Sequence, residues 1–296
     1  MGQVEELLRQ LGAGHGEVLA AASATTLEAG GKRLRPMLVL LCAGPRGSQE
    51  AIRAAAGIEL IHMATLVHDD VLDAAPLRRG RPTVAATGGR EGATASGDLL
   101  FSRAFALLAG GGDDRSIELL SSASVALARG ELVQRRDAYD TTVDEERYLR
   151  RCRLKTASLF ECACLLGRDE KALGEFGAAI GLAFQLLDDV LDISGPPERT
   201  GKARGTDLLD GTVTLPLILA AQRDPSIAAA DLRALDGPAA ERLCERIEAS
   251  GALRQVRARA LEMVAEAKRL LRSAGFDAEE RRLLDLVADG VVQRYS

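Results

Sequence analysis

Two short acidic motifs carry the clearest chemical signal in this chain. Residues 69–73 and 188–192 both read DDVLD, and each follows an apolar stretch. On a helix, residues four apart lie one above the other, so the first and last Asp of each motif present two carboxylates on one face. Like charges at this spacing oppose helix formation by roughly 0.2–0.5 kcal/mol, and a hard cation such as Mg²⁺ relieves the repulsion while bridging to phosphates. The pattern therefore predicts a diphosphate clamp.

A single motif of this kind is more typical of a solvated helix end. Two copies favour metal binding, because each is followed by basic residues, Arg78 and Arg79 in the first case and Lys202 in the second. Pro76 is expected to end or bend the first helix, which would fold the two arginines back towards the carboxylates. The two motifs lie in different helices and must meet across a shared cavity if they act together.

A basic element precedes both motifs. Residues 31–36 read GKRLRP, in which Pro36 suits the first turn of a helix. Lys32 and Arg35 are three residues apart and can point the same way, and the start of a helix also favours anions. The element predicts an anion site, although a basic surface turn fits these residues about as well.

Isolated polar residues in apolar helical stretches are further candidates. Lys155 and Thr156 lie in a segment of small and apolar residues, where a buried Lys needs an anionic partner. Gln185 lies one turn before Asp188 and His62 lies two turns before the first motif, so each can face the same groups as the carboxylates. A surface Lys and a packed core amide are the alternatives for Lys155 and Gln185.

The rest of the sequence predicts the helices that position these groups. Apolar residues recur at intervals of three and four, and strong helix formers dominate, so we expect an all-α protein. Helix breaks are predicted at the glycine-rich points 30–31, 44–45, 88–89, 110–112, 195–197 and 237–238. No composition shift divides the chain, so residues 1–296 are predicted to form a single domain.

Bulk composition argues against several classes of protein. A net charge of -5 disfavours nucleic-acid partners, because binding to a phosphate backbone needs a clustered excess of Lys and Arg. No apolar stretch approaches the roughly 20 residues that span a bilayer, and the first residues do not resemble a signal peptide. We therefore expect a cytoplasmic protein without stable membrane insertion. Its five cysteines are odd in number and are expected to be reduced, structural thiols.

Together these residues resemble the trans-isoprenyl diphosphate synthase (polyprenyl synthetase) family, in particular its medium- and long-chain members. The match follows the family order through residues 31–36, 60–62, 69–79, 97–98, 155–156, 184–192, 205–208 and 214–216. The resemblance implies the isoprenoid synthase fold, an antiparallel helical bundle around a central active-site cavity, and a homodimer.

The resemblance also implies a role for each matching residue. About two to three Mg²⁺ ions per active site would be bound by Asp69, Asp73 and Asp188, with Asp70, Asp189 and Asp192 in support. The diphosphate of isopentenyl diphosphate would be held by Lys32, Arg35, His62 and Arg79. The allylic diphosphate would be held by Arg78, Lys155, Thr156, Gln185 and Lys202. The residues expected to take part in catalysis are Asp69, Asp70, Asp73, Asp188, Asp189, Lys155 and Lys202.

Two features bear on how this chain would carry out the family reaction. Thr212 stands where many relatives have Lys, so one contact near the diphosphate is expected to be weaker. Ala64 and Thr65 lie five and four residues before the first motif, Ala64 about 7.5 Å down the helix axis. Short-chain relatives usually carry an aromatic residue there, so the product is expected to exceed about fifteen carbons, with about thirty to forty as the family-based value. Phe101 or Phe105 would set the final length.

Two other functions remain open. A terpene cyclase shares the helical architecture and an Asp-rich motif, but it usually lacks the second DDxxD and the Lys32 and Arg35 site. A non-catalytic subunit of a heteromeric synthase typically loses the Asp motifs, and both are intact here. The sequence therefore favours the synthase and leaves its exact product, primer and assembly open.

Overall fold

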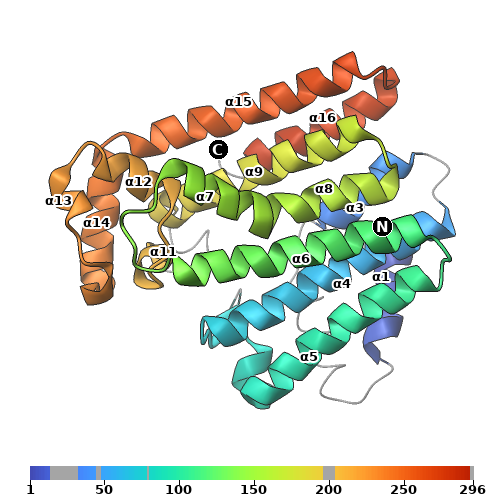
Figure 1. Cartoon of the computed structure of the whole chain (residues 1–296), viewed down its shortest axis with the longest axis horizontal. Coiled ribbons are helices and arrows are strands. Elements are labelled where there is room, and N and C mark those ends of the chain that lie inside the picture. The colour runs from blue at the N-terminus through green and yellow to red at the C-terminus, as the bar shows by residue number, and fades with distance from the viewer. Residues whose placement is uncertain (14–32, 45–47, 79, 196–203, 294–296) are drawn as a thin grey trace. The chain divides into compact units, whose positions relative to one another are not determined.

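A computed structural model of the chain describes residues 1–13, 33–44, 48–78, 80–195 and 204–293, and helices dominate them (Figure 1). The longer helices are α1 (Gly2–Ala13), α3 (Leu34–Ala43), α4 (Gln49–Leu72), α5 (Val84–Ala109), α6 (Asp114–Arg136), α7 (Glu145–Cys152), α8 (Ser158–Gly167), α9 (Lys171–Ser194), α14 (Gly237–Ala249), α15 (Ala252–Ser273) and α16 (Ala278–Gln293). Shorter helical segments are η1 (Arg153–Ala157), α11 (Thr206–Leu209), α12 (Leu215–Ala221), α13 (Pro225–Ala228) and η2 (Leu232–Ala234). The antiparallel strands β1 (Leu77–Arg78) and β2 (Arg81–Pro82) are the only strands in these ranges. The predicted all-α class is confirmed.

The chain divides into two compact units. The first consists of Met1–Ser124 and Cys162–Gly174, and the second consists of Val125–Glu161 and Glu175–Ser296. The first acidic motif belongs to the first unit and the second motif to the second unit. The expectation of a single domain over residues 1–296 stays a prediction.

The core of the first unit is the helix pair α4 and α5, which lie side by side, with α3 and α1 against α4 (Figure 1). Ser48 begins α4, because its side chain accepts a hydrogen bond from the backbone N–H of Ala51 at 3.1 Å, and Thr83 caps α5 in the same way. Apolar residues of α4 such as Ile58 and Ile61 are fully buried, each contributing about 1.5–3 kcal/mol. This packing fixes the end of α4 that carries the first motif.

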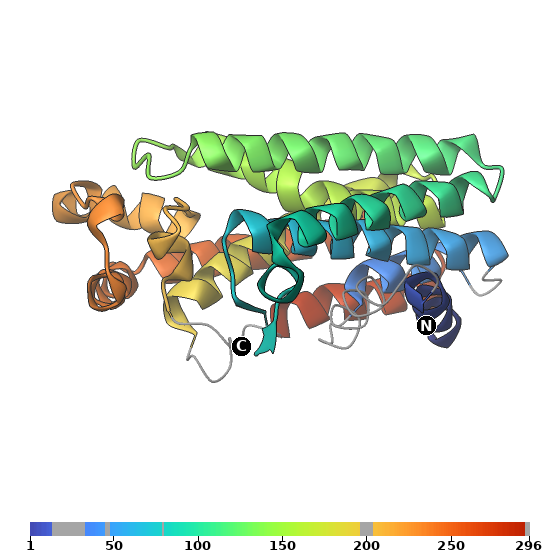
Figure 2. The ribbon, with the colours of Figure 1, turned by 90° about the horizontal axis from the view of Figure 1, so that it is seen from below.

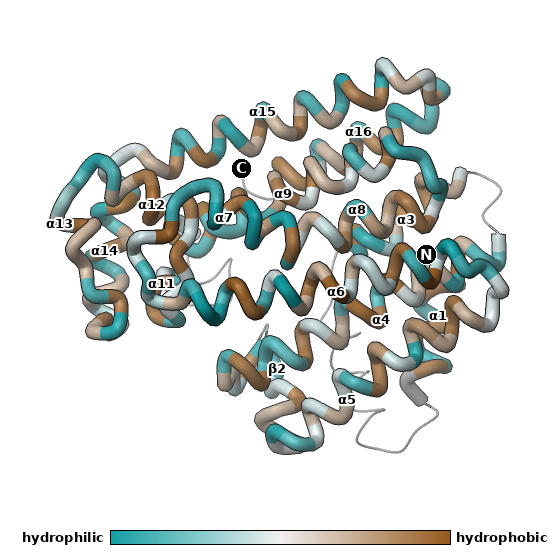
Figure 3. The backbone as a smooth tube through the Cα atoms, viewed as in Figure 1, coloured by the Kyte–Doolittle hydropathy of each residue, from teal (hydrophilic) through white to brown (hydrophobic). Residues whose placement is uncertain are grey.

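The core of the second unit includes α9, whose residues Phe176, Ile180 and Leu186 are fully buried. In the same unit, α15 packs against α16, α12 and α14, and α12, α13 and α14 form a compact group (Figure 2). The tube of α15 alternates between teal and brown in Figure 3, as expected for a helix with one buried face, which includes Val256 and Ala260. The apolar surroundings of α9 make any carboxylate near its end costly unless it is compensated.

The predicted helix breaks are largely confirmed. Gly44 caps α3 with φ 79°, and Gly110 ends α5. The break predicted at 88–89 is confirmed, because Gly89 has non-helical backbone angles (φ 73°, ψ 171°) that interrupt the helical geometry within α5. Glycine lacks a Cβ and adopts this backbone conformation at little cost. The breaks predicted at 30–31 and at 196–197 lie outside the described residues.

All five cysteines are buried free thiols, as predicted. In the part of the chain that the structure describes, no helix combines the length and the apolar character needed to cross a membrane.

Gly181 marks a close approach inside the second unit. A Cβ at this position would lie 2.8 Å from Cβ of Phe160 and 2.9 Å from Cα of Ala157. Gly181→Ala is therefore expected to lower the free energy of unfolding by about 1–3 kcal/mol, because the neighbouring backbone must move. Gly92→Ala is the matched control, since a Cβ there meets nothing within 4 Å and should leave stability unchanged or raise it by up to about 1 kcal/mol. Urea unfolding measures both, and equal stability of the two variants would contradict the close approach.

Candidate functional site

The first acidic motif lies at the C-terminal end of α4. Asp73 ends the helix, and its backbone N–H donates to the carbonyl of Asp69 at 2.8 Å, so the two residues occupy one turn as predicted. Asp69 is half-buried and Asp73 is exposed. A helix C-terminus carries a partial negative charge, and the last turn of α4 contains no basic residue to offset it. Carboxylates in this position favour a bound cation.

Asp70, the second residue of the motif, is buried with 4% of its surface exposed. Its Oδ1 accepts a hydrogen bond from Nε of Arg78 at 2.7 Å. Arg78 lies on β1, beyond the turn at Pro76, so the predicted return of this arginine to the carboxylates is confirmed. The ion pair offsets the cost of burying Asp70 and fixes the end of α4.

Two arginines of the GKRLRP element lie in the first unit. The same unit contains a buried carboxylate on α4 that interacts with both. Arg33 precedes α3 and forms an ion pair with Glu59, which is 3% exposed. Burial lowers the pKa of Arg35 to about 10, while the charge of Glu59 opposes this shift, so Arg35 stays protonated at neutral pH. Arg33 and Glu59 were not among the predicted site residues, although a lone Glu inside an apolar helix signals a buried cationic partner.

The other predicted residues on α4 lie one to two turns before the motif. His62 and Thr65 are half-buried, and the Thr65 hydroxyl donates to the backbone carbonyl of His62 at 2.7 Å. Ala64, in contrast, has 0% of its surface exposed. His68 turns towards α5, where its ring stacks on Phe101 with centroids 5.9 Å apart. Of the two predicted length-determining positions, Thr65 is therefore the one with exposed surface.

The second acidic motif lies in the last turns of α9 and repeats the pattern of the first. Asp188 and Asp192 are half-buried, whereas Asp189 is 2% exposed. Tyr148 of α7 donates its hydroxyl to Oδ2 of Asp189 at 2.5 Å, and Gln185 donates Nε2 to Oδ1 at 2.7 Å. In both motifs the second Asp is buried and held by side-chain donors.

The surroundings of Asp189 have opposing effects on its pKa. Burial raises the pKa of Asp189, and the negative charge of Asp207 acts in the same direction. The hydrogen bonds from Tyr148 and Gln185 and the positive charge of Arg151 act against this rise. Tyr148 and Arg151 were not among the predicted residues, since nothing in their local sequence separates them from ordinary helix residues.

A π-helical turn, η1, positions Lys155 and Thr156. Such turns disturb the regular helical pattern and are frequent at functional sites. The Thr156 hydroxyl donates to Oε1 of Gln185 at 2.6 Å. The predicted residues Thr156 and Gln185 therefore belong to one chain of hydrogen bonds that ends at Asp189.

Lys155 has the anionic partner that its apolar surroundings require. Its Nζ lies 2.5 Å from Oε2 of Glu131 on α6, and Arg135 contacts the other oxygen at 2.6 Å. Burial raises the pKa of Glu131, but the charge and hydrogen bond of Lys155, with those of Arg135, bring it below its usual value. Gly130 permits the contact, because a Cβ there would lie 2.7 Å from the backbone N of Lys155. Glu131 was missed by sequence reasoning, since its pairing depends on a residue 24 positions away.

Asp192 contacts the residues at the start of α11. Its backbone carbonyl accepts from the N–H of Gly205 at 2.9 Å, and its Oδ2 accepts from the N–H of Asp207 at 3.2 Å. Three residues of the predicted set, Lys32, Arg79 and Lys202, lie outside the described residues.

The two clusters satisfy the chemical requirement of Mg²⁺, which prefers oxygen ligands. Among the described residues, no three His, Cys, Asp or Glu side chains form a ready-made metal site. Mg²⁺ does not require one, because it commonly binds through one or two carboxylates and completes its coordination with water and substrate phosphates. Asp69 and Asp73 in the first unit, and Asp188 in the second, therefore fit an ion that bridges to phosphate better than one enclosed by protein.

Comparisons with known proteins agree with this chemistry. The sequence model "Polyprenyl synthetase" matches residues 16–247. Heptaprenyl diphosphate synthase component 2 of Geobacillus stearothermophilus is 43% identical over 226 residues, 73% of this chain and 70% of that protein. Geranylfarnesyl diphosphate synthase of Aeropyrum pernix is 36% identical over 302 residues, 93% of this chain and 94% of that protein.

The fold agrees as well. The crystal structure of a polyprenyl synthase from Caulobacter crescentus, complexed with calcium and isoprenyl diphosphate, matches with a TM-score of 0.94 and 35% identity, covering 100% of this chain and 95% of that one. An all-α fold with two DDVLD motifs and these relatives defines the class of protein, and the chain is a prenyltransferase. It belongs to the polyprenyl synthetase family.

Tyr148→Phe tests the hydrogen bond that holds Asp189. The change removes only the hydroxyl, and leaving a buried carboxylate without this donor costs about 1–3 kcal/mol, so we expect the free energy of unfolding to fall by that amount. Tyr139→Phe is the control, because Tyr139 is half-buried and its ring stacks with Arg233 at 4.5 Å, a contact that the change preserves. Denaturant unfolding at pH 7 measures both. If Tyr148→Phe were as stable as the unsubstituted protein, the hydrogen bond would make no net contribution.

Proposed function

We propose that this chain is an all-trans polyprenyl diphosphate synthase that condenses isopentenyl diphosphate with an allylic diphosphate. The observation that carries the proposal is the repeated carboxylate cluster, in which Asp70 and Asp189 are buried and held while Asp69 and Asp188 keep accessible surface. A cyclase would not need the second cluster, and a non-catalytic subunit would not need to preserve either one.

The proposed diphosphate sites follow the distribution of cations. Arg35 and His62 of the first unit, with Lys32 and Arg79, would bind the diphosphate of isopentenyl diphosphate. Arg78, Lys155, Thr156, Gln185 and Lys202 would bind the allylic diphosphate. The protonated state of Arg35 supports this assignment, since its charge remains available at neutral pH. Hydrogen bonds to charged groups are stronger than those between neutral groups, so these side chains favour diphosphate over a neutral ligand.

The proposed reaction begins with loss of diphosphate from the allylic substrate. Mg²⁺ held by Asp69, Asp73 and Asp188 would supply positive charge that stabilises the leaving diphosphate. The chain of hydrogen bonds from Thr156 through Gln185 holds Asp189 in place, so this part of the second cluster need not reorganise as charge develops. The double bond of isopentenyl diphosphate then attacks C1 of the allylic cation, and a proton leaves to the departing diphosphate, which restores an alkene.

Product length and assembly are finer parts of the proposal. We expect a product of more than about fifteen carbons, and about thirty to forty by the resemblance, because Ala64 would leave room along α4. The relatives named above are named for products of different chain length, which supports the idea that small sequence changes set the product length within the family. We also propose that the protein is cytoplasmic and forms a homodimer. The dimer is supported by two exposed apolar residues of α6, Val125 and Leu132, which are 56% and 71% exposed and two turns apart. A different partner subunit is the alternative, since one relative is a "component 2".

The direct test incubates purified protein with labelled isopentenyl diphosphate, Mg²⁺ and dimethylallyl, farnesyl or geranylgeranyl diphosphate, and then resolves the dephosphorylated products. We expect products longer than the primer, lost on adding a chelator. Asp69→Asn and Asp188→Asn should each reduce turnover by at least about 100-fold, because each removes a carboxylate that would hold the Mg²⁺ by which the leaving diphosphate is stabilised. Asp114→Asn, an exposed Asp at the start of α6, is the control and should keep full activity. No incorporation with any primer would favour the cyclase or the partner subunit.

Ala64→Phe tests the proposed limit on product length. An aromatic side chain at this position is expected to shorten the longest product, because it would fill space along α4 below the first motif. Ala64 is fully buried, so circular dichroism must first show that the variant folds. Thr65→Phe is the companion variant at the adjacent, half-buried position. If both folded variants gave the product of the unsubstituted protein, these positions would not set the length.

A further inference from the structure

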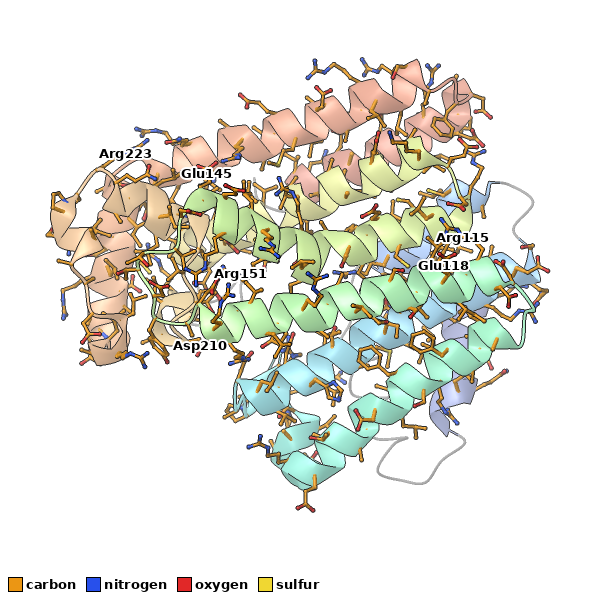
Figure 4. All side chains as sticks on the ribbon, viewed as in Figure 1. Arg115, Glu118, Glu145, Arg151, Asp210 and Arg223 are labelled. Carbon is orange, nitrogen blue, oxygen red and sulfur yellow. The ribbon has the colours of Figure 1, made fainter. Side chains whose placement is uncertain are left out.

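Arg151 is a buried arginine of the second unit that the proposed mechanism does not use. It belongs to α7 (Figure 4) and has 4% of its surface exposed. Its Nη2 donates to the backbone carbonyl of Val213 at 2.7 Å, and its guanidinium carbon lies 5.3 Å from the centre of the Tyr148 ring. These two contacts fix the guanidinium in one place.

The positive charge of Arg151 is only partly compensated. Its Nη1 is buried and has no hydrogen-bond partner among the residues that the structure describes. A buried guanidinium is costly unless its donors are satisfied and its charge is matched. Other cations of the same unit are matched directly, as in the ion pair of Arg147 with Asp137 at 2.6 Å. Arg151 therefore retains a donor and a charge for an anion.

The second acidic cluster lies within electrostatic range of Arg151. The charge of Arg151 acts on Asp189, and the Tyr148 ring that it contacts donates its hydroxyl to the same carboxylate. Its carbonyl contact, Val213, directly follows the uncharged residue Thr212. A lysine at residue 212 would therefore bring a second positive charge close to Arg151.

We propose that Arg151 supplies positive charge from α7 and so strengthens the binding of diphosphate at the second carboxylate cluster. Arg151 is a positioning residue that acts by its fixed charge in a buried environment, where electrostatic interactions are less screened than at the surface. This inference rests on the proposed function, because it takes the allylic diphosphate as the anion. A purely structural alternative is that Arg151 only anchors the Val213 carbonyl.

Arg151→Gln and Arg151→Lys together separate the two possibilities, because both shorten the side chain that reaches the Val213 carbonyl but only Lys keeps the positive charge. The first measurement is calorimetric binding of inorganic pyrophosphate in the presence of Mg²⁺, followed by KM for each substrate. For Arg151→Gln we expect about tenfold weaker pyrophosphate binding and a similar rise in KM for the allylic diphosphate, with less change in KM for isopentenyl diphosphate. Arg151→Lys should stay close to the unsubstituted protein, and Thr212→Lys added to Arg151→Gln should restore binding.

Arg150→Gln is the matched control, since Arg150 is the exposed neighbour on the same helix and its charge is screened by solvent. It should bind pyrophosphate as the unsubstituted protein does. Arg151→Met, which fills the buried space with an apolar chain, is the second neutral variant if Arg151→Gln does not fold. Unchanged pyrophosphate binding in a folded neutral variant, or failure of Thr212→Lys to restore it, would overturn the proposal. If the unsubstituted protein elongates no primer, the proposed function fails, while the pyrophosphate comparison still tests Arg151.

Discussion

Mutual repulsion of carboxylates at the ends of two buried helices is the constraint on which the rest of the structure depends. Each DDVLD motif lies at the end of its helix that carries a partial negative charge. The repulsion among its three Asp side chains therefore adds to their unfavourable interaction with the helix dipole. In both units this repulsion is reduced in the same way, because the second Asp is buried and accepts hydrogen bonds from side-chain donors. Asp70 receives the guanidinium of Arg78, and Asp189 receives Tyr148 and Gln185. The first and last Asp of each motif keep accessible surface, where the proposed cation would bind.

The same logic governs the basic residues, because a buried cation also needs a fixed partner. Glu59 matches Arg33, and Glu131 matches Lys155 and Arg135. These pairs hold the basic side chains in fixed positions. In the proposed synthase, binding of diphosphate would then require little reorganisation, which is the condition under which charged groups stabilise a leaving group most effectively.

Backbone geometry supports this arrangement of charges. The π-helical turn η1 contains Lys155 and Thr156, and Gly130 lets α6 approach Lys155 closely enough for Glu131 to reach it. Gly181 plays a similar part by bringing α9 against Ala157 and Phe160. The second acidic cluster is therefore positioned by small residues that have no chemistry of their own.

The sequence by itself determined the all-α class, most helix ends and the acidic motifs, because helical periodicity and the spacing of Asp69 with Asp73 are local properties. It also predicted that Arg78 would return to the carboxylates, since Pro76 limits the path of the chain. The break at Gly89 was predicted as well, because a glycine adopts a positive φ at little cost. The tertiary structure alone decided that Asp70 and Asp189, not the other Asp residues of the two motifs, are buried. It also decided that Tyr148, Glu131, Glu59 and Arg151 surround the predicted groups. Burial and pairing between residues tens of positions apart depend on how helices pack, and no local pattern encodes that.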